Sequence, residues 1–386
     1  MSSNGSRDRT DGACVSCLRR GWLLSALSGP LECCARDRAR LLELLALSDG
    51  ELLRAAAGRR GAELRRSYEQ FPLRGRDDAG ELARDPDVQA ICRHRDGYPR
   101  ALSGPAAPRA LEVAGGARRL ARLTAAPVVA ILGSRRASDY GMEMARGLAR
   151  GLAASGVSVT ASMTDGIAIA AHLGALDASG ASIAVLGGGL GVGCPARRRS
   201  LCERVRRRGC VVSELPRDCH GRRWGQLASE RIVVGLAALT VLVEAEHTPE
   251  DLAPARIARA LGRPVAAIPG RVTSPLSRGT HALLMDGANL VRGPRDVLEL
   301  LYASGARASE PDATPAPCGV GSSAGLTPWL QATLERVGAG CDTPDKLTRA
   351  GADTAEVLLA LSELELMGLL ARGDAGRYVP RQSLAG

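Results

Sequence analysis

A short turn that contains glycine and arginine lies between a candidate strand and a candidate helix, in the sequence PVVAILGSRRASDYG over residues 127–141. Gly133 lets an anion approach the backbone closely, and a helix start presents free N–H groups and the positive end of its dipole. The guanidinium groups of Arg135 and Arg136 can each bind two phosphate oxygens. We therefore expect Gly133, Ser134, Arg135 and Arg136 to bind phosphate. The alternative is a structural turn with two solvated arginines.

Two later stretches offer similar chemistry. Gly187, Gly188 and Gly189 follow a candidate strand, so their backbone can approach a phosphate or a nucleotide closely. Arg278 begins a candidate helix over residues 278–286, where its charge would add to the free N–H groups of the helix start. The hydroxyls at that start fit the alternative, an ordinary helix cap.

His172 lies on a candidate helix over residues 166–178, at a spacing that turns it toward the sheet. A lone histidine of this kind is more often packed and hydrogen-bonded than catalytic. The sequence provides no serine, cysteine or aspartate that forms a convincing triad with it. We therefore expect no catalytic residue at this position.

The composition is that of a globular chain with an excess of positive charge. The 386 residues include 51 Lys and Arg against 41 Asp and Glu, which gives a formal net charge of +10. Such a balance favours a polyanion, for example nucleic acid, as the partner. A GC-rich genome would also favour arginine and is the simpler explanation. Aromatic residues make up only 2% of the chain, which limits base stacking.

The sequence predicts a cytoplasmic protein without a membrane span. No apolar run approaches about 18 residues, and the polar N-terminus has no signal-peptide core. The 11 cysteines are scattered, which indicates reduced thiols. Cys14 and Cys17 form a C-x-x-C pair, and Cys33 and Cys34 follow, so these four are the alternative candidates for a zinc site. Adjacent cysteines bind one ion awkwardly, and we expect free thiols and no metal.

Five segments are expected along the chain. A disordered tail is expected over residues 1–20, and leucines at helical spacing predict a small helical (SAM-like) domain over residues 21–85. Alternating strands and helices predict a Rossmann-like core over residues 86–302. A stretch rich in Pro, Ala, Gly and Ser predicts a flexible linker over residues 303–325. Three candidate helices and a hairpin predict a winged-helix domain over residues 326–386.

The core pattern predicts the α/β fold class, with a doubly wound parallel sheet. Ligands of such sheets bind at the carboxyl ends of the strands. The candidate strands are VVAIL, VSVTAS, SIAVL, CVVSE, TVLVEA, PVAAIP and ANLV.

Taken together, these features resemble the DNA-processing protein A family (DprA, also called Smf). The motifs that support the resemblance are RDGYP at 95–99, VAILGSR at 129–135, IAVLGGGL at 183–190 and, most distinctive, IPGRVTSPLSRGT at 268–280. The resemblance implies a protein that binds single-stranded DNA in the bacterial cytoplasm without catalytic turnover, so we expect no enzymatic activity, no catalytic residue and no cofactor. It also implies that the protein protects incoming DNA in natural transformation, helps load the RecA recombinase, and forms a homodimer through the core.

The resemblance also implies which residues contact DNA. Arg135 matches the family's GSR arginine, which faces the DNA, while Gly166 and Arg231 match a glycine and an arginine of two further motifs. Two positions depart from the family. Asp165 replaces an arginine, and Glu230 replaces a basic or amide residue, so both bring negative charge to a phosphate.

These departures predict a divergent member with weakened or relocated DNA binding. A dense arginine cluster could compensate for them, or it could be a solvated helix face. It comprises Arg197, Arg198, Arg199, Arg206, Arg207 and Arg208.

The candidate recognition helix of the winged-helix domain has acidic residues, Glu356, Glu363 and Glu365, and no Arg or Lys. A helix that reads a DNA groove needs basic or amide side chains, so we expect this domain not to read duplex DNA. Two alternatives to the leading function remain. One is a nucleotide-handling enzyme of the phosphoribohydrolase type, and the other is a degenerate paralogue that has lost DNA binding.

Overall fold

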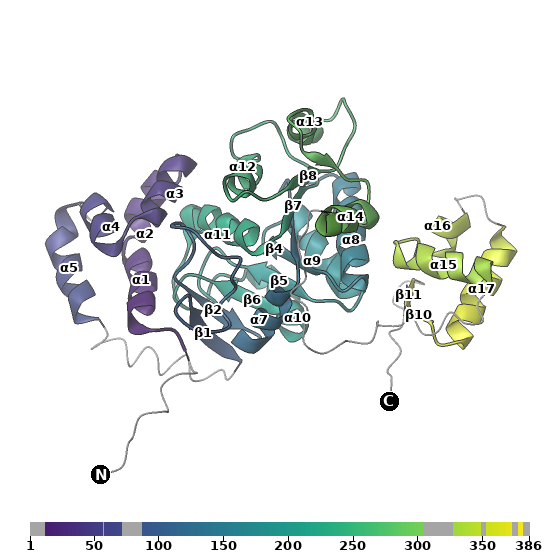
Figure 1. The fold of residues 1–386 in the computed structure, drawn as a ribbon, viewed down its shortest axis with the longest axis horizontal. Coiled ribbons are helices and arrows are strands. Elements are labelled where there is room, and N and C mark those ends of the chain that lie inside the picture. Colours follow the sequence, from purple (N-terminus) through teal and green to yellow (C-terminus); the bar gives the residue numbers. More distant parts are fainter. Residues whose placement is uncertain are drawn as a thin grey trace, which may run out of the picture.

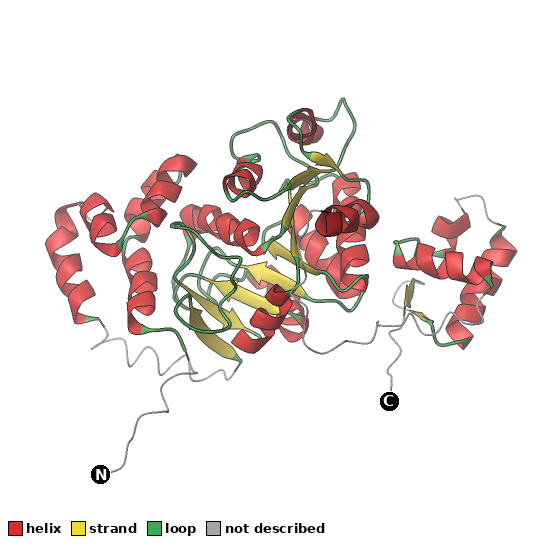
Figure 2. Ribbon diagram, in the orientation of Figure 1, coloured by secondary structure: helices red, strands yellow, loops and turns green. Residues whose placement is uncertain are grey.

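The computed structural model describes residues 12–56, 58–71, 87–303, 327–348, 353–372 and 377–380. An α/β core (residues 87–303) lies between an N-terminal helical unit (residues 12–71) and a C-terminal unit (residues 327–380), as Figure 1 shows. Within the core, helices cover both faces of one sheet (Figure 2).

Leucine side chains at helical spacing hold the N-terminal helical unit together. Leu23, Leu41 and Leu52 are buried in one cluster. Trp224 of the core inserts into this cluster, and its Nε1 donates to Ser28 Oγ at 2.8 Å. The helices are α1 (Val15–Ala26), α2 (Ser28–Cys34), α3 (Arg38–Ala46), α4 (Asp49–Ala56) and α5 (Gly61–Gln70), with the 3-10 turn η1 (Gly58–Arg60) before α5.

The helical unit begins earlier than the sequence pattern predicts. The expected tail over residues 1–20 is wrong from Val15 onward, because α1 begins there. Residues 1–11 lie outside the described residues, as do residues 72–86 at the other end of this unit.

Nine strands form the central sheet, in the order β1-β2-β6-β5-β4-β3-β7-β8-β9. The seven strands from β6 to β9 in this order are parallel, whereas β1 and β2 are antiparallel at one edge. The strands are β1 (Val88–Cys92), β2 (Ala110–Ala114), β3 (Val128–Leu132), β4 (Ser158–Ser162), β5 (Ser182–Val185), β6 (Cys210–Ser213), β7 (Leu239–Leu242), β8 (Val265–Ala267) and β9 (Asn289–Leu290). The expected doubly wound α/β core is confirmed, with an antiparallel edge added.

Side chains of β3 alternate between two apolar layers, as its period of two requires. Val128, Ala130 and Leu132 pack with α11, α12 and α13. Val129 and Ile131 pack with α8, α9 and α14 on the other face. The helices are α7 (Ala117–Ala125), α8 (Asp139–Ala154), α9 (Ile167–Asp177), α10 (Arg199–Arg208), α11 (Arg222–Leu236), α12 (Ala253–Ala260), α13 (Arg278–Met285) and α14 (Pro294–Ala303), with the 3-10 turns η2 (Ala196–Arg198) and η3 (Pro275–Ser277).

One cysteine pair departs from the expectation of reduced thiols. Cys194 and Cys202 form a disulfide that joins the loop after β5 to α10. The described cysteines outside this pair are free. Among the described residues, no helix has the length and apolar character needed to cross a membrane.

The C-terminal unit consists of α15 (Pro328–Gly338), α16 (Pro344–Thr348), α17 (Thr354–Leu366) and an antiparallel hairpin of β10 (Leu370–Arg372) and β11 (Tyr378–Pro380). This order of elements is the expected one, and its assignment as a winged helix stays a prediction. Glu356 and Glu363 on α17 are exposed, as expected, whereas Glu365 is half-buried, which the sequence pattern does not predict. The expected linker falls almost entirely on residues 304–326, which lie outside the described residues.

Candidate nucleic-acid interface

A groove lies at the carboxyl ends of the central parallel strands. Two cavities, of ≈ 260 Å³ and ≈ 670 Å³, make it up, and both are lined by Ser162, Thr164 and Gln226, so they adjoin. The chain leaves β3 toward β4 on one side, whereas β7 pairs with β3 on the other side. The groove therefore lies beside the topological switch point, where open α/β sheets bind ligands. We call it the carboxyl-edge groove.

The turn after β3 is fixed by close backbone contacts. Ser134 N donates to the Glu244 carbonyl at 2.7 Å, and the Ser134 carbonyl accepts from Ile167 N at 3.2 Å. A Cβ at Gly133 would lie 2.7 Å from the Glu244 carbonyl oxygen, and one at Gly166 would lie 2.2 Å from the Ser134 carbonyl oxygen. Gly166 also has a φ of 75°, which favours glycine. Both glycines thus position the turn that presents the arginines.

The N-terminus of α8 already holds a carboxylate of the chain itself. Glu244 is buried, its Oε1 accepts from Ser138 Oγ at 2.5 Å, and its Oε2 accepts from Ser138 N at 2.9 Å. Gly141 leaves the space, because a Cβ there would lie 2.3 Å from Glu244 Oε2. Glu244 thus occupies part of the helix start at which the sequence pattern predicts a phosphate. The sequence indicates this role of Glu244 only by placing an acidic residue directly after an apolar strand.

Arg135 and Arg136 lie on the solvent side of this turn and are both exposed. Arg135 Nη1 donates to Gln226 Oε1 of α11 at 3.0 Å, and Arg135 lines the larger cavity. The bond orients Arg135 across the carboxyl-edge groove while its guanidinium stays exposed. We therefore keep the prediction that Gly133, Ser134, Arg135 and Arg136 bind phosphate. The turn after β3, rather than the start of α8, would supply the contacts.

Gly187 and Gly188 line the smaller cavity, and they also allow α11 to approach the sheet. A Cβ at Gly187 would lie 2.8 Å from both the Cα and the N atom of Gln226. The Gly187 carbonyl oxygen is in turn only 2.0 Å from a Cβ built at Gly225. The glycines that follow β5 therefore place Gln226, the partner of Arg135, in the groove.

Asp165, the first acidic departure from the family pattern, is neutralised by the arginine cluster. Arg197 Nη2 lies 2.5 Å from Asp165 Oδ2, and Arg198 forms a second ion pair with the same carboxylate. The sequence could not show that the turn η2, which carries Arg197 and Arg198, contacts the loop before Gly166. The negative charge expected to repel a phosphate here has two guanidinium partners.

Glu230, the second departure, is neutralised from the N-terminal helical unit. Arg38, at the start of α3, donates from Nη1 to Glu230 Oε2 at 2.6 Å, and both residues line the larger cavity. Burial raises the pKa of the Glu230 carboxyl, and the charge of Arg38 opposes that shift. Arg38 is a groove residue that the sequence pattern does not reveal.

Arg231 does not face the groove, which corrects the expected DNA contact. Its side chain is buried, and Nη2 donates to both carboxylate oxygens of Glu214 at 2.7 and 2.6 Å. Nε donates to the Ala106 carbonyl and Nη1 to the Ala228 carbonyl, each at 2.7 Å. Arg231 therefore braces α11 against the segment between β1 and β2 and is not available to a phosphate.

Two further candidates lie outside the groove lining. Arg278 is exposed at the start of α13, and neither cavity of the carboxyl-edge groove includes it. His172 is buried beneath the groove, where Nδ1 lies 2.7 Å from Ser182 Oγ and Nε2 lies 3.1 Å from the Ser162 carbonyl oxygen. The expectation of a packed, hydrogen-bonded histidine is confirmed.

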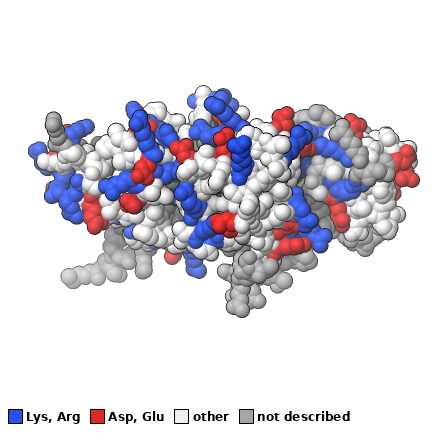
Figure 3. Space-filling model, turned by 90° about the horizontal axis from the view of Figure 1, so that it is seen from above, with Lys and Arg blue, Asp and Glu red and all other residues white. Residues whose placement is uncertain are grey.

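Positive charge is spread over the molecule. In the view of Figure 3, Lys and Arg side chains occur across the face with Asp and Glu among them, and no single uniform basic patch covers it. The local arrangement at the groove, in which arginines pair with the two acidic departures, is therefore more informative than the net charge of +10.

Known proteins share this arrangement of elements. A sequence model of the family described as DNA recombination-mediator protein A matches residues 89–302. The chain is 37% identical over 250 residues to the putative DNA processing protein DprA of Mycobacterium tuberculosis, a match that covers 64% of this chain and 63% of the relative. It is 35% identical over 250 residues to the protein Smf of Escherichia coli, a match that covers 64% of this chain and 66% of that relative. The matches thus span just under two thirds of these relatives' length.

Solved structures agree. The DNA processing protein A of Streptococcus pneumoniae superposes with a TM-score of 0.57 at 28% identity, over 72% of this chain and 96% of that one. That of Helicobacter pylori, described for its single-stranded DNA binding mode, superposes with a TM-score of 0.50 at 24% identity, over 56% of this chain and 96% of that one, and shows the same fold. With a family match over more than half of its length, the chain belongs to the DNA recombination-mediator protein A family.

Proposed function

We propose that this protein binds single-stranded DNA in the carboxyl-edge groove, without catalytic turnover. The observation that supports the proposal most directly is the exposed Arg135, oriented across the groove by Gln226. Backbone groups of the turn after β3 and Gly187 and Gly188 line the same groove. Contacts of this kind hold phosphates without reading base sequence.

Membership of the family supports the same function, and its members are DNA-binding and DNA-processing proteins rather than known enzymes. The single-stranded DNA binding described for the Helicobacter pylori relative is the specific precedent. Against a degenerate paralogue, both acidic departures have arginine partners, so neither Asp165 nor Glu230 adds an unpaired negative charge. We therefore favour a functional groove over a degenerate one.

The test is a salt-titrated binding measurement of the full chain with a homopolymer single strand and with a duplex of the same length. We expect tighter binding to the single strand. Arg135→Glu should weaken that binding about tenfold or more, because a charge-assisted contact contributes about 1.5–3 kcal/mol. The magnitude of the salt slope should fall by about 0.7 for each phosphate that the variant no longer binds.

The matched control is Arg118→Glu, which changes the charge equally on an exposed residue of α7, at the opposite edge of the sheet. We expect it to leave the affinity within about twofold, which is the range of a remote, screened charge. Equal affinities of wild type and Arg135→Glu would refute the proposed groove.

We further propose the cellular role that accompanies this activity in the family: a cytoplasmic homodimer that protects incoming DNA in natural transformation and helps load RecA. Light scattering of the full chain would give the dimer mass. Stimulation of RecA ATPase on single strands coated with single-strand-binding protein would report loading. A monomer at micromolar concentration, or no stimulation by a DNA-binding-competent protein, would contradict this role while leaving the groove proposal standing.

A further inference from the structure

Four potential metal ligands converge where the N-terminal helical unit meets the edge of the sheet. Cys14 and Cys17 come from the start of α1, Cys92 ends β1, and His94 follows two residues later. Their ligand atoms all lie within 4.8 Å of one another. The two segments are separated by more than 70 residues of sequence, so only the fold brings them together.

The distances within this cluster are those of a tetrahedral zinc site. Cys14 Sγ and Cys17 Sγ each lie 3.3 Å from His94 Nδ1, and Cys14 Sγ lies 3.8 Å from Cys92 Sγ. Zinc–sulfur bonds of about 2.3 Å and a zinc–nitrogen bond of about 2.0–2.1 Å place tetrahedral ligands about 3.8 Å (S to S) and about 3.6 Å (S to N) apart. One ion fits among the four atoms with little adjustment.

The surroundings favour bound thiolates. Cys14 N donates toward Cys92 Sγ at 3.4 Å, a bond that a coordinated thiolate accepts well. Cys14 and Cys17 lie at the N-terminal end of the 12-residue α1, whose dipole stabilises negative sulfur. Cys17 and Cys92 are buried, whereas His94 is exposed, which leaves an approach for the ion from solvent.

We propose that Cys14, Cys17, Cys92 and His94 bind one Zn²⁺ ion as a structural site. Four protein ligands close the coordination sphere, which is typical of structural rather than catalytic zinc. The soft thiolate set with one imidazole favours zinc over magnesium, calcium or manganese. The ion would fasten α1 to β1, and so fix the helical unit that supplies Arg38 to the groove. The proposal is independent of DNA binding.

In this site, Cys92 and His94 take the place of Cys33 and Cys34, the second pair of ligands that the sequence pattern suggests. Cys33 and Cys34 lie at the end of α2, outside the cluster, and Cys33 is exposed. The sequence identifies the C-x-x-C pair but not its partners, because Cys92 and His94 stand in no recognisable zinc spacing to it. A disulfide between Cys14 and Cys17 is the competing use of this pair, and it leaves the convergence of Cys92 and His94 unexplained.

The first experiment measures metal in the full chain, purified without chelator or affinity metal from zinc-supplemented cells. We expect about one zinc per chain by mass spectrometry of the elements. Exchange with Co²⁺ should give the intense visible absorption and the sulfur-to-cobalt charge transfer of tetrahedral thiolate coordination. Absence of zinc together with absence of the cobalt spectrum after reduction would overturn the proposal, and so would a Cys14–Cys17 disulfide in the freshly purified protein.

The second experiment separates metal binding from folding by conservative exchange of one ligand. His94→Ala should lower zinc affinity at least tenfold in competition with a chromophoric chelator. His94→Cys should keep about one zinc and shift the cobalt spectrum toward four-sulfur coordination. If His94 were not a ligand, both variants would keep the wild-type zinc affinity and the wild-type cobalt spectrum, and that result would contradict the site.

The control is the double variant Cys33→Ser/Cys34→Ser, which removes two thiols of the same helical unit. It should keep zinc, and a chelator should lower its thermal unfolding midpoint as much as it lowers that of the wild type. Cys92→Ser should lose both zinc and the chelator response. Zinc retained by Cys92→Ser, or lost only with Cys33 and Cys34, would assign the metal elsewhere and overturn the proposal.

Discussion

Asp165 shows how one residue can reverse its expected effect when its neighbours become visible. Its carboxylate stands where the family resemblance predicts an arginine, yet Arg197 and Arg198 bind it from the turn that precedes α10. These arginines are consequently committed to a carboxylate rather than to DNA. The two ion pairs thus neutralise a carboxylate that would repel a phosphate. They also engage two guanidinium groups that would otherwise attract one.

Asp165→Asn tests this balance. The exchange removes the negative charge and frees Arg197 and Arg198, so single-stranded DNA should bind about two- to fivefold more tightly. That change is equivalent to about 0.4–1 kcal/mol, within the range of an exposed ion pair. The salt slope should steepen by about 0.7 if one arginine gains a phosphate. Fluorescence anisotropy at several salt concentrations measures both.

Asp286→Asn is the control, since it removes an equal charge and frees Arg259, which pairs with Asp286 between α12 and the end of α13. It should leave the affinity for single strands unchanged within about twofold. An increase with both variants would indicate a general charge effect and contradict the local explanation.

His172 links pH to the stability of the core. Burial lowers its pKa from 6.5 to about 4. Well above pH 6.5, near pH 7.5 and higher, the histidine is neutral in both the folded and the unfolded chain, so it does not affect stability there. Below that pH the unfolded chain takes up the proton first, and the free energy of unfolding falls by about 2 kcal/mol between pH 7.5 and pH 5.

Urea unfolding at the two pH values measures this loss. In His172→Gln the amide keeps polar contacts to Ser182 and the Ser162 carbonyl but cannot take up a proton, so its pH dependence should be flatter by the same amount. Removal of the exposed His247 by His247→Gln should leave the dependence as in wild type. Parallel pH profiles of wild type and His172→Gln would contradict the assignment.

At the scale of elements, the groove depends on how closely the loops after β3 and β4 approach each other. Gly166 begins the approach to α9 with a φ of 75°, and its α-carbon faces the Ser134 carbonyl. Gly166→Ala combines backbone strain with a clash, so we expect a loss of about 1–3 kcal/mol in stability and weaker single-strand binding even where the chain is folded. Urea titration and anisotropy test the two effects separately.

Gly262→Ala provides a matched control, because Gly262 also has a positive φ, 67°, but a Cβ there meets nothing within 4 Å. It should cost about 1 kcal/mol and leave DNA binding intact. If both variants bind DNA as wild type does, the turn after β3 does not position the contact.

Sequence reasoning succeeds for elements whose pattern is local. The buried run of β3 and the glycine turn behind it are readable because a parallel strand is apolar on both faces. It fails for β1 and β2, which are short edge strands around a turn-rich segment with no helix between them. α7 and α14 are likewise absent from the sequence expectation.

The candidate site follows the same division. The turn at Gly133 to Arg136 is a local motif, so the sequence identifies it, and Gly133 and Arg135 of this turn line the groove. The roles of Arg231, Glu244 and Arg38 depend on partners far away in sequence, at Glu214, Ser138 and Glu230. No spacing rule reports such pairs, because they exist only after the sheet and the helical unit have assembled.

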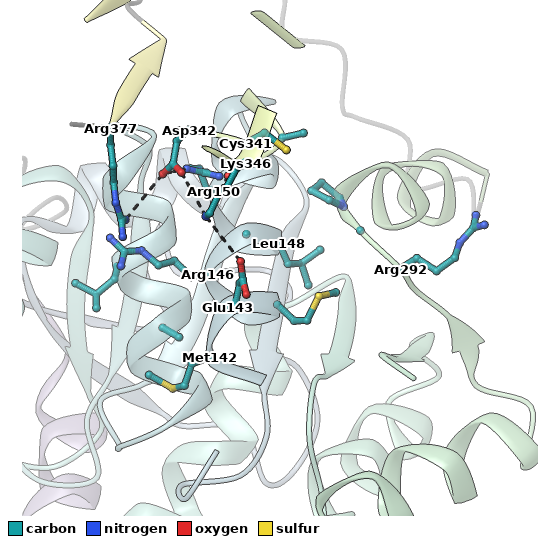
Figure 4. A pocket seen from close by; sticks show the side chains of 18 residues that line it. Met142, Glu143, Arg146, Leu148, Arg150, Arg292, Cys341, Asp342, Lys346 and Arg377 are labelled. Atoms are coloured by element: carbon teal, nitrogen blue, oxygen red, sulfur yellow. Dashed lines mark hydrogen bonds and ion pairs between the residues drawn. The ribbon is translucent and has the colours of Figure 1, made fainter. Parts of the chain in front are cut away.

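At the scale of the whole molecule, the two outer units are attached to the core by different chemistry. The N-terminal helical unit shares an apolar cluster with Trp224 of α11. The C-terminal unit instead contacts α8 through charged side chains beside a cavity of ≈ 640 Å³ (Figure 4). Apolar burial resists salt, whereas ion pairs are screened, so the C-terminal contact should be the more easily released.

Asp342 is the centre of that contact. Its side chain is 4% exposed and lies 2.8 Å from Arg150 Nη1 of α8, 3.3 Å from Lys346 Nζ and 3.9 Å from Arg377 Nη1. Asp342→Asn keeps the shape but leaves Arg150 without a counter-charge in a largely buried position. We expect the C-terminal unit to detach from α8, because breaking a buried pair commonly costs about 3–5 kcal/mol.

Detachment has two separable signatures. Small-angle X-ray scattering should show a larger radius of gyration, and hydrogen exchange should rise along α8 while α17 keeps its protection, since the buried leucines of the unit's own core are untouched. Asp345→Asn, on an exposed residue of α16, should leave both measurements as in wild type. Because the contact is electrostatic, raising the salt concentration should move the wild-type scattering toward that of Asp342→Asn. Salt-independent scattering with unchanged exchange in α8 would mean that other contacts hold the unit in place.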